Sequence, residues 1–198
     1  MKNQTLLRML NRLTLFLFVI TISLIAACSD DPESTNEEEV ITTVLVALDP
    51  EEAAGEDEGE IITLSWDDVN LDAIVDASEV TVSGPLFTDK TYDATIQILN
   101  KSGDSEIDIS QEIEEEAEEH IFCFAVSDAG ISITIQDEDK NGLPLGLKSI
   151  WSTTSLESTG TVTITLRHQP GVKTGDCPGA GETDATLTFP VAVTFGGE

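Results

Sequence analysis

The sequence predicts an all-β protein: an antiparallel β-sandwich of immunoglobulin-like or jelly-roll type, with one short acidic helix, behind an N-terminal signal segment. Three observations indicate this fold. Apolar residues recur with period two from residue 40 onward, as in half-buried strands. Turn signals separate about nine such runs. The chain has 198 residues, of which 40% are hydrophobic, enough for a single core.

The first 27 residues are typical of a signal peptide. Three basic residues precede an uncharged apolar stretch, 13–27, which is shorter than the roughly 20 residues of a membrane-spanning helix. The following residues, IAAC at 25–28, resemble the lipobox of bacterial lipoprotein signals. This resemblance implies that Cys28 is lipidated and that the protein is anchored in a membrane. An ordinary secretory signal or an N-terminal anchor helix is the alternative.

Residues 28–39 are polar and acidic, and they predict a flexible tether because they cannot bury enough apolar surface to order themselves. Its start, SDDPE at 29–33, resembles the short signals that send lipoproteins of the Bacteroidota to the outer face of the outer membrane. The alternative is a tether whose charges serve only solubility.

Residues 40–198 are expected to form one β-sandwich domain. Threonines alternate with apolar residues in several runs, which suits a pleated surface in water. Pro190 predicts an edge strand or a bulge, because proline cannot donate to a sheet ladder. The expected strands are 40–48, 62–66, 80–87, 92–99, 121–127, 131–136, 147–153, 161–166 and 186–195.

The segment 108–120 departs from this pattern and predicts a helix on one edge of the sandwich. Ile109, Ile113 and Ala117 recur four apart among glutamates, and Asp108 with Gln111 has the form of a capping box. The glutamates are interpreted as a solvated face. A carboxylate patch for divalent cations or for a basic partner is the functional alternative.

A DxDxNG motif makes Asp137, Asp139 and Asn141 candidate calcium ligands, because it places oxygen atoms on alternate residues of a tight turn. Position 12 of such a loop should be glutamate, but it is Lys148. Asn-Gly is also a strong hairpin signal, and a turn without an ion is the favoured interpretation.

A second alternating set consists of Asp68, Asn70 and Asp72, with Glu79 at position 12 of the loop that Asp68 begins. Ala73 stands where calcium loops carry glycine. This set is the weaker of the two calcium signals.

The remaining cysteines and the two histidines are the other candidate site residues. With Cys28 lipidated, Cys123 and Cys177 form an even pair, and a disulfide is expected outside the cytoplasm. A buried Cys123 and a free loop thiol are the alternative. His120 and His168 could bind copper, zinc or haem if their strands pair antiparallel, although surface histidines are the favoured interpretation.

Charge and motifs exclude several functions. The chain carries 38 acidic and 9 basic residues, a net charge of -29, so nucleic-acid binding through phosphates is not expected. The sequence contains no GxSxG, HExxH, P-loop or GxGxxG motif. A hydrolase using two of the many carboxylates is a remote alternative. Exposed Trp66 or Trp151 would favour glycan binding, whereas core burial is preferred for both.

Residues 114–195 resemble a group of small acidic lipoproteins of the Bacteroidota whose function is unknown. The resemblance rests on EEEAEEHIFCF, DEDKNGLPLGL, TGTVTITLRHQPGVK and GETDATLTFPVAV. Members are sometimes labelled with the type 1 periplasmic-binding fold, but that fold needs two lobes of alternating βαβ units, which this chain lacks. The resemblance transfers no functional residues.

The sequence therefore predicts a non-enzymatic, lipid-anchored binding module on the surface of the outer membrane. Its expected partners are the membrane, through the anchor, and a glycan or a surface protein. The alternative is a calcium- or metal-binding carrier of small ligands, with calcium as the suggested cofactor.

Overall fold

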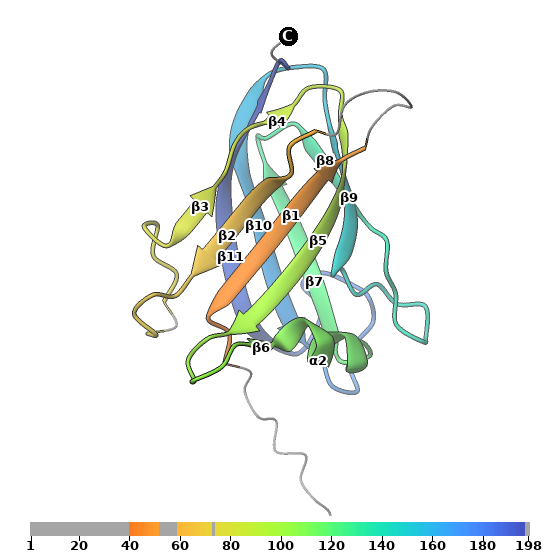
Figure 1. Ribbon diagram of the computed structural model, residues 1–198. Helices are drawn as coiled ribbons and strands as arrows, with labels where there is room; N and C mark the ends of the chain where they lie inside the picture. Colours follow the sequence, from red (N-terminus) through yellow and green to blue (C-terminus); the bar gives the residue numbers. More distant parts are fainter. Residues whose placement is uncertain (1–39, 52–58, 73, 197–198) are drawn as a thin grey trace, which may run out of the picture. The chain divides into compact units, whose positions relative to one another are not determined.

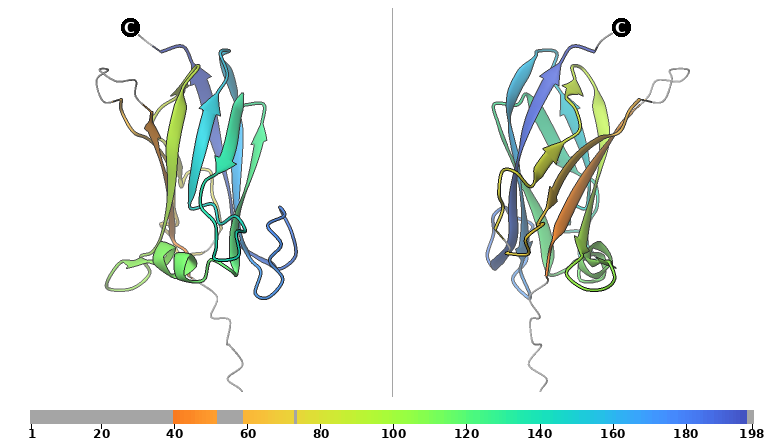
Figure 2. Two further views of the ribbon diagram at one scale, coloured as in Figure 1. Left: turned by 90° about the vertical axis from the view of Figure 1, so that its right-hand side faces the viewer. Right: turned by 60° about the vertical axis from the view of Figure 1, so that its left-hand side comes forward.

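The computed structural model describes residues 40–51, 59–72 and 74–196, which form two β-sheets packed face to face (Figures 1 and 2). One sheet has the strand order β3-β2-β1-β5-β9-β8, with β6 beside β5; the other has the order β4-β11-β10-β7. The predicted all-β sandwich is confirmed. The expected signal peptide, Cys28 and the acidic tether lie outside the described residues.

Eight of the nine strands that the alternating pattern predicted are present as single strands. The larger sheet contains β1 (Thr43–Pro50), β2 (Ile62–Asp67), β3 (Val80–Val82), β5 (Thr91–Asn100), β6 (Ile107–Asp108), β8 (Ile131–Ile135) and β9 (Lys148–Thr153). The smaller sheet contains β4 (Leu86–Phe87), β7 (His120–Ser127), β10 (Ser158–His168) and β11 (Glu182–Thr194). All pairs are antiparallel except β4 with β11, which is parallel.

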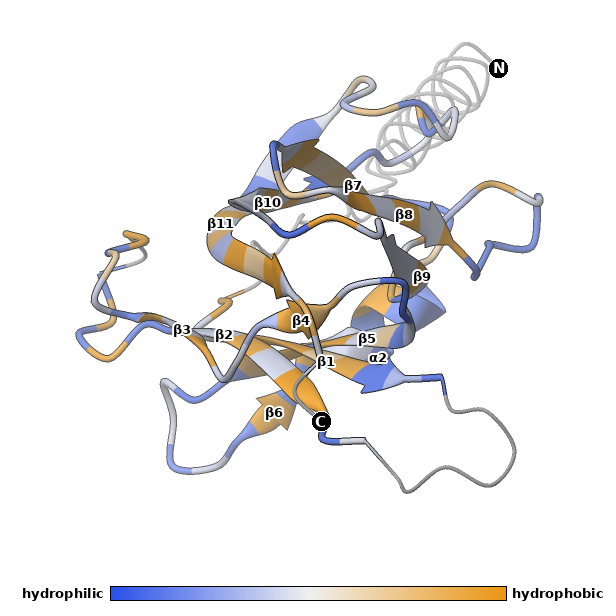
Figure 3. Cartoon of the chain, turned by 90° about the horizontal axis from the view of Figure 1, so that it is seen from above, coloured by the Kyte–Doolittle hydropathy of each residue, from blue (hydrophilic) through white to orange (hydrophobic). Residues whose placement is uncertain are grey.

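The core lies between the two sheets, where the inward-facing residues of each strand meet. Figure 3 shows apolar stretches along β10 and β11 on one side and along β1 and β5 on the other. The largest fully buried side chains include Trp151, Tyr92, Phe122 and Phe189. Each buries an area of roughly 150–250 Å², so these four rings dominate the hydrophobic stabilisation.

The prediction of a single strand over 80–87 is wrong, because this segment forms two short strands that belong to different sheets. Val80–Val82 pairs with β2, whereas Leu86–Phe87 pairs with the end of β11. Gly84 and Pro85 lie between the two pieces. Proline lacks an N–H group, so the ladder stops there and the chain crosses to the other sheet.

The acidic helix is shorter than the expected 108–120. Helix α2 spans Ile109–Glu115, and Asp108 is its N-cap, accepting a hydrogen bond from Ser110 N. Ile109 and Ile113 are buried against the sandwich. Glutamates continue past Glu115 and no basic residue stands in the last turn. Negative charge at a helix C-terminus is unfavourable, which accounts for the early end.

Pro190 lies on an edge, as the sequence predicted. The neighbouring strand β4 pairs only with Val193 and Thr194, so the outer side of β11 is unpaired over most of its length. The Thr194 carbonyl oxygen accepts a hydrogen bond from Thr88 N on that side. Residues an even number of positions apart in a strand direct their backbone N–H and C=O groups to the same side of the strand. The backbone nitrogen of Pro190 therefore faces the unpaired side of β11, as the Thr194 carbonyl does, and its missing N–H costs no hydrogen bond of the sheet.

Candidate functional site

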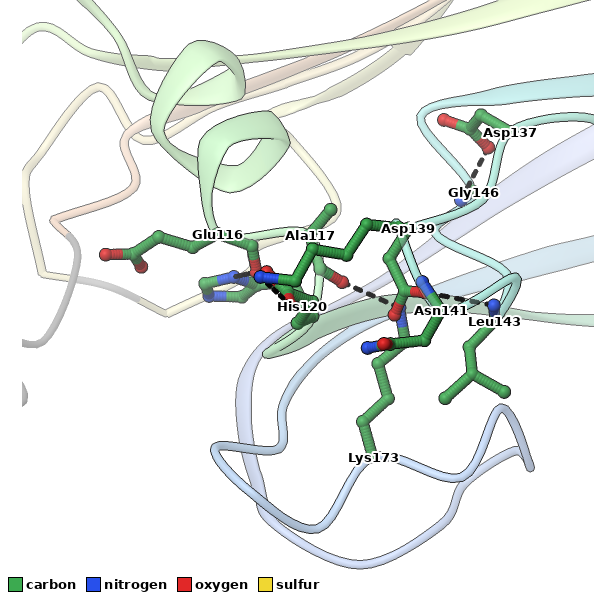
Figure 4. Close-up of polar contacts among 11 residues, drawn as sticks. Glu116, Ala117, His120, Asp137, Asp139, Asn141, Leu143, Gly146 and Lys173 are labelled. Atoms are coloured by element: carbon green, nitrogen blue, oxygen red, sulfur yellow. Dashed lines mark hydrogen bonds and ion pairs between the residues drawn. The ribbon is translucent and has the colours of Figure 1, made fainter.

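The DxDxNG motif forms the turn between β8 and β9 (Figure 4). Asp137 accepts hydrogen bonds from Gly146 N at 2.7 Å and from Lys148 N at 3.1 Å. Gly142 has a φ of 77°, a left-handed conformation that favours glycine. The motif therefore builds a turn whose carboxylates are held by the turn's own backbone.

Asp139 is the second carboxylate of the turn, and it is paired with a lysine from a distant loop. Its side chain is fully buried, and its Oδ1 accepts hydrogen bonds from Asn141 N at 2.8 Å and Leu143 N at 3.0 Å. Its Oδ2 lies 3.1 Å from Lys173 Nζ, on a side chain that is only 2% exposed. Burial disfavours the ionised carboxylate, but the two backbone donors and Lys173 outweigh it and lower the pKa of Asp139.

Lys173 takes the position that a cation would occupy beside Asp139. Its Nζ also donates to the Ala117 carbonyl oxygen at 2.7 Å, next to the end of α2. Asn141 contributes its backbone N–H to Asp139. Within the described ranges, no three His, Cys, Asp or Glu side chains are grouped so that they could hold a metal ion. The contacts of Asp137, Asp139 and Asn141 thus support the interpretation as a structural turn.

The two histidines meet at the same end of the sandwich. β7 and β10 are antiparallel and place His120 directly opposite His168, with ring centroids 4.6 Å apart and planes at 7°. His120 is 1% exposed, and burial lowers its pKa to about 4. His168 Nε2 lies 3.4 Å from Glu119 Oε2. The antiparallel pairing needed for a shared metal is present, but the rings stack on each other instead of converging on a common point.

A disulfide joins Cys123 on β7 to Cys177 in the loop between β10 and β11, with the two Cα atoms 5.6 Å apart. The same loop is held from inside by Gln169, which is fully buried and donates to the carbonyl oxygens of Pro178 and Ala180. Together with Lys173, these contacts fix the loop against the start of β7. Counting cysteines suggested the bridge, whereas nothing in the sequence pointed to Lys173.

The loop between β2 and β3 holds the second alternating set. Its acidic and amide side chains accept hydrogen bonds from the loop's own backbone: Asp72 N donates to Asp68 and Asn70, and Ile74 N donates to Asp72. Asp76 stands at position 9 of the calcium-loop numbering, and no periodic pattern in the sequence marks it. Ala73 lies outside the described residues.

Glu79 ends this loop and is buried, with 7% of its surface exposed. Its Oε2 accepts hydrogen bonds from Trp66 Nε1 at 3.3 Å and from Asp76 N at 3.4 Å, both neutral donors.

Trp66 and Trp151 are 3% and 0% exposed, as the preferred interpretation expected. Neither indole can serve as an exposed platform for a glycan.

The same β2–β3 loop is the most apolar exposed segment of the domain. Of the twelve large hydrophobic side chains that are exposed in the described part of the chain, four lie within 69–75. They are Val69, Leu71, Ile74 and Val75, exposed by 80%, 54%, 59% and 39%. We call these four residues, with the exposed polar residues Asn70, Asp72 and Asp76 between and beside them, the β2–β3 loop surface.

Comparisons with family models, curated proteins and solved structures find no match to this chain. No helix among the described residues is long and apolar enough to cross a membrane.

Proposed function

We propose that the chain is an envelope lipoprotein, anchored through Cys28 at the outer membrane, whose β-sandwich is a non-enzymatic binding module for a surface protein. The observation that carries this proposal is the β2–β3 loop surface. Within the short segment 69–75, four apolar side chains are exposed, those of Val69, Leu71, Ile74 and Val75. Single exposed apolar residues are normal, but a group of them is typical of an interaction site.

The composition of this loop favours a particular kind of partner. Aspartates stand before, among and after its apolar residues, and the whole chain has a net charge of -29. A basic protein segment with apolar side chains would meet both features, because opposite charges speed the encounter and apolar burial supplies affinity. A disulfide-bonded domain is also suited to the oxidising space outside the cytoplasm.

Photo-crosslinking on cells that carry the full chain tests this proposal. A photoreactive amino acid replaces Asn70 in the loop surface or, as a control, Leu156, which is 70% exposed between β9 and β10. We expect a discrete protein adduct from position 70 that is lost when Leu71→Ser and Ile74→Ser are added. An equal adduct from position 156, or an adduct that survives the serine changes, would contradict the proposal.

Calcium binding by the same loop is a second candidate function, favoured by the spacing of its oxygen-bearing residues. Asp68, Asn70, Asp72, Asp76 and Glu79 stand at positions 1, 3, 5, 9 and 12 of a calcium loop. Glu79 brings a buried carboxylate that is bonded only to neutral donors in the described structure. Asp68 is also buried, whereas the exposed carboxylates of Asp72 and Asp76 would have to close onto the ion.

Terbium luminescence tests the second candidate, because Trp66 Nε1 lies 3.3 Å from Glu79 Oε2 and can sensitise a lanthanide bound there. Excitation of tryptophan should produce terbium emission that calcium displaces. Trp66→Phe should abolish the emission, whereas Trp151→Phe should preserve it. Emission that persists in Glu79→Gln with Asp68→Asn would place the ion elsewhere and refute calcium binding by this loop.

A further inference from the structure

We propose that Lys173 and Asp139 condense in the mature protein to an amide that links Lys173 Nζ to Asp139 Cγ, with loss of one water. The two side chains are 2% and 0% exposed, and Nζ lies 3.1 Å from Oδ2. Asp139 belongs to the β8–β9 turn and Lys173 to the β10–β11 loop, so the amide would crosslink two distant parts of the chain. This proposal is independent of the proposed function.

The surroundings of Asp139 activate its carboxyl carbon. Asn141 N and Leu143 N both donate to Oδ1, at 2.8 and 3.0 Å. When an amine attacks Cγ, negative charge develops on one carboxyl oxygen, and two fixed backbone donors stabilise that charge as an oxyanion hole does. Oδ2 contacts Lys173 Nζ at 3.1 Å, whereas both backbone donors bind Oδ1, so Oδ2 is the oxygen that can leave.

Lys173 is positioned as the nucleophile. Its Nζ is held between Asp139 and the Ala117 carbonyl oxygen, 2.7 Å away. Such fixed proximity replaces a bimolecular encounter and thereby lowers the activation free energy. After condensation the single N–H of the amide can still donate to Ala117, so the loop keeps this hydrogen bond.

The reaction balances within the pair. One ammonium proton passes to Oδ2, which gives a neutral amine and a carboxylic acid; burial reduces the free-energy cost of this transfer, because it disfavours both charged groups. The nitrogen lone pair then attacks Cγ. A second nitrogen proton passes to Oδ2, the Cγ–Oδ2 bond breaks, and water leaves. The ion pair is the resting form, and the small neutral fraction limits the rate of crosslinking.

The chain contains matched controls for this reaction. Lys140 pairs with Glu118, and Lys148 lies 4.0 Å from Glu114, but these side chains are 31–74% exposed. Solvated ion pairs keep their charges and contact water, so we expect both to remain free amines and free carboxylates.

Peptide mapping of the purified full chain tests the proposal. After reduction and alkylation, Cys123 and Cys177 no longer join the strands, and trypsin is expected to release 102–140 and to cleave after Lys173. With the amide present, 102–140 stays joined to 168–198, about 18 Da below the sum of the two masses, and Lys173 is not cleaved. Free 102–140 together with a peptide that ends at Lys173 would overturn the proposal.

Two variants assign the linkage. Lys173→Arg keeps the positive charge, but a guanidinium stays protonated and cannot act as the nucleophile. Asp139→Ala removes the electrophile. The joined peptide should be absent from both, and its persistence in either would overturn the assignment. The map of the unaltered protein decides the question even if these variants fail to fold.

Discussion

His120 and His168 lie directly opposite each other on β7 and β10, with their rings stacked 4.6 Å apart at the end of the sandwich where α2 and the disulfide-bonded loop meet. The pair joins two strands whose register is fixed along their whole length. It also places a buried titratable group beside Glu116 and Glu119 from the turn after α2, and near Lys173 from the loop.

Stability should fall as the pH drops from about 6.5 to about 4. The pKa of His120 is lowered to about 4 in the folded protein, whereas an unfolded histidine titrates near 6.5. Between these two pH values the unfolded chain therefore binds more protons than the folded protein. The contribution of His120 to stability is fully present above pH 6.5 and is lost as the pH falls toward 4. We expect a loss of about 2 kcal/mol across this window. Urea unfolding at several pH values measures it.

His120→Phe serves as the control for this prediction, since it keeps a ring that stacks on His168 but cannot titrate. The variant should show a flatter dependence of unfolding free energy on pH between 4 and 6.5. An unchanged slope would mean that other groups cause the acid sensitivity.

Reduction of the Cys123–Cys177 disulfide should destabilise the domain by about 2–4 kcal/mol, because the bond closes a loop of 54 residues. Thermal unfolding with and without a reductant gives the difference. Double replacement by alanine should give a similar loss and make the protein insensitive to the reductant. A reductant effect that remains in the double variant would show that the bond is not its cause.

Gly160→Ala should be strongly destabilising, on the order of 3 kcal/mol. A Cβ on Gly160 would overlap the Ser127 carbonyl oxygen and lie 2.6 Å from Ala129 N, so β10 could not stay close to the turn after β7. Gly84→Ala is the matched control, because nothing lies within 4 Å of its added Cβ. Chemical denaturation of both variants measures the contrast, and equal stabilities would contradict it.

Removing the carboxylate of Asp139 should cost at least about 3–5 kcal/mol, since it leaves Lys173 as a buried charge without its partner and also removes the proposed amide. Lys101→Ala breaks only an exposed pair, that of Lys101 with Asp67, whose side chains are 43% and 48% exposed, and should cost less than about 1 kcal/mol. Unfolding free energies of the two variants are compared directly. Similar costs would mean that Asp139 contributes no more than a surface charge.

The sheets could be predicted because burial of one face imposes a period of two, which residues such as Ile62, Leu64 and Trp66 display along the chain. The division of 80–87 between two sheets was missed, since periodicity continues across Gly84 and Pro85 while the chain changes its partner. Burial of Trp66 followed from its register with Ile62 and Leu64.

The contacts that define the site were less accessible to sequence reasoning. Asp139 sits in a recognisable motif, but its partner Lys173 is an isolated lysine in a loop, and no local pattern links the two. The stacking of His120 on His168 depends on which strands pair and in which register, and that is decided by packing of the whole sandwich. Asp76 was missed because the exposed loop carries no periodic signal.

The open side of β11 affects how the folded domains would behave when many copies are held close together. A long unpaired strand edge is a template on which neighbouring copies can add strands and polymerise into fibres. Pro190 interrupts that template at its centre, since it offers no donor there, and the threonines beside it are exposed and polar. Many copies crowded in one plane could therefore collide at this edge without fusing into a continuous sheet.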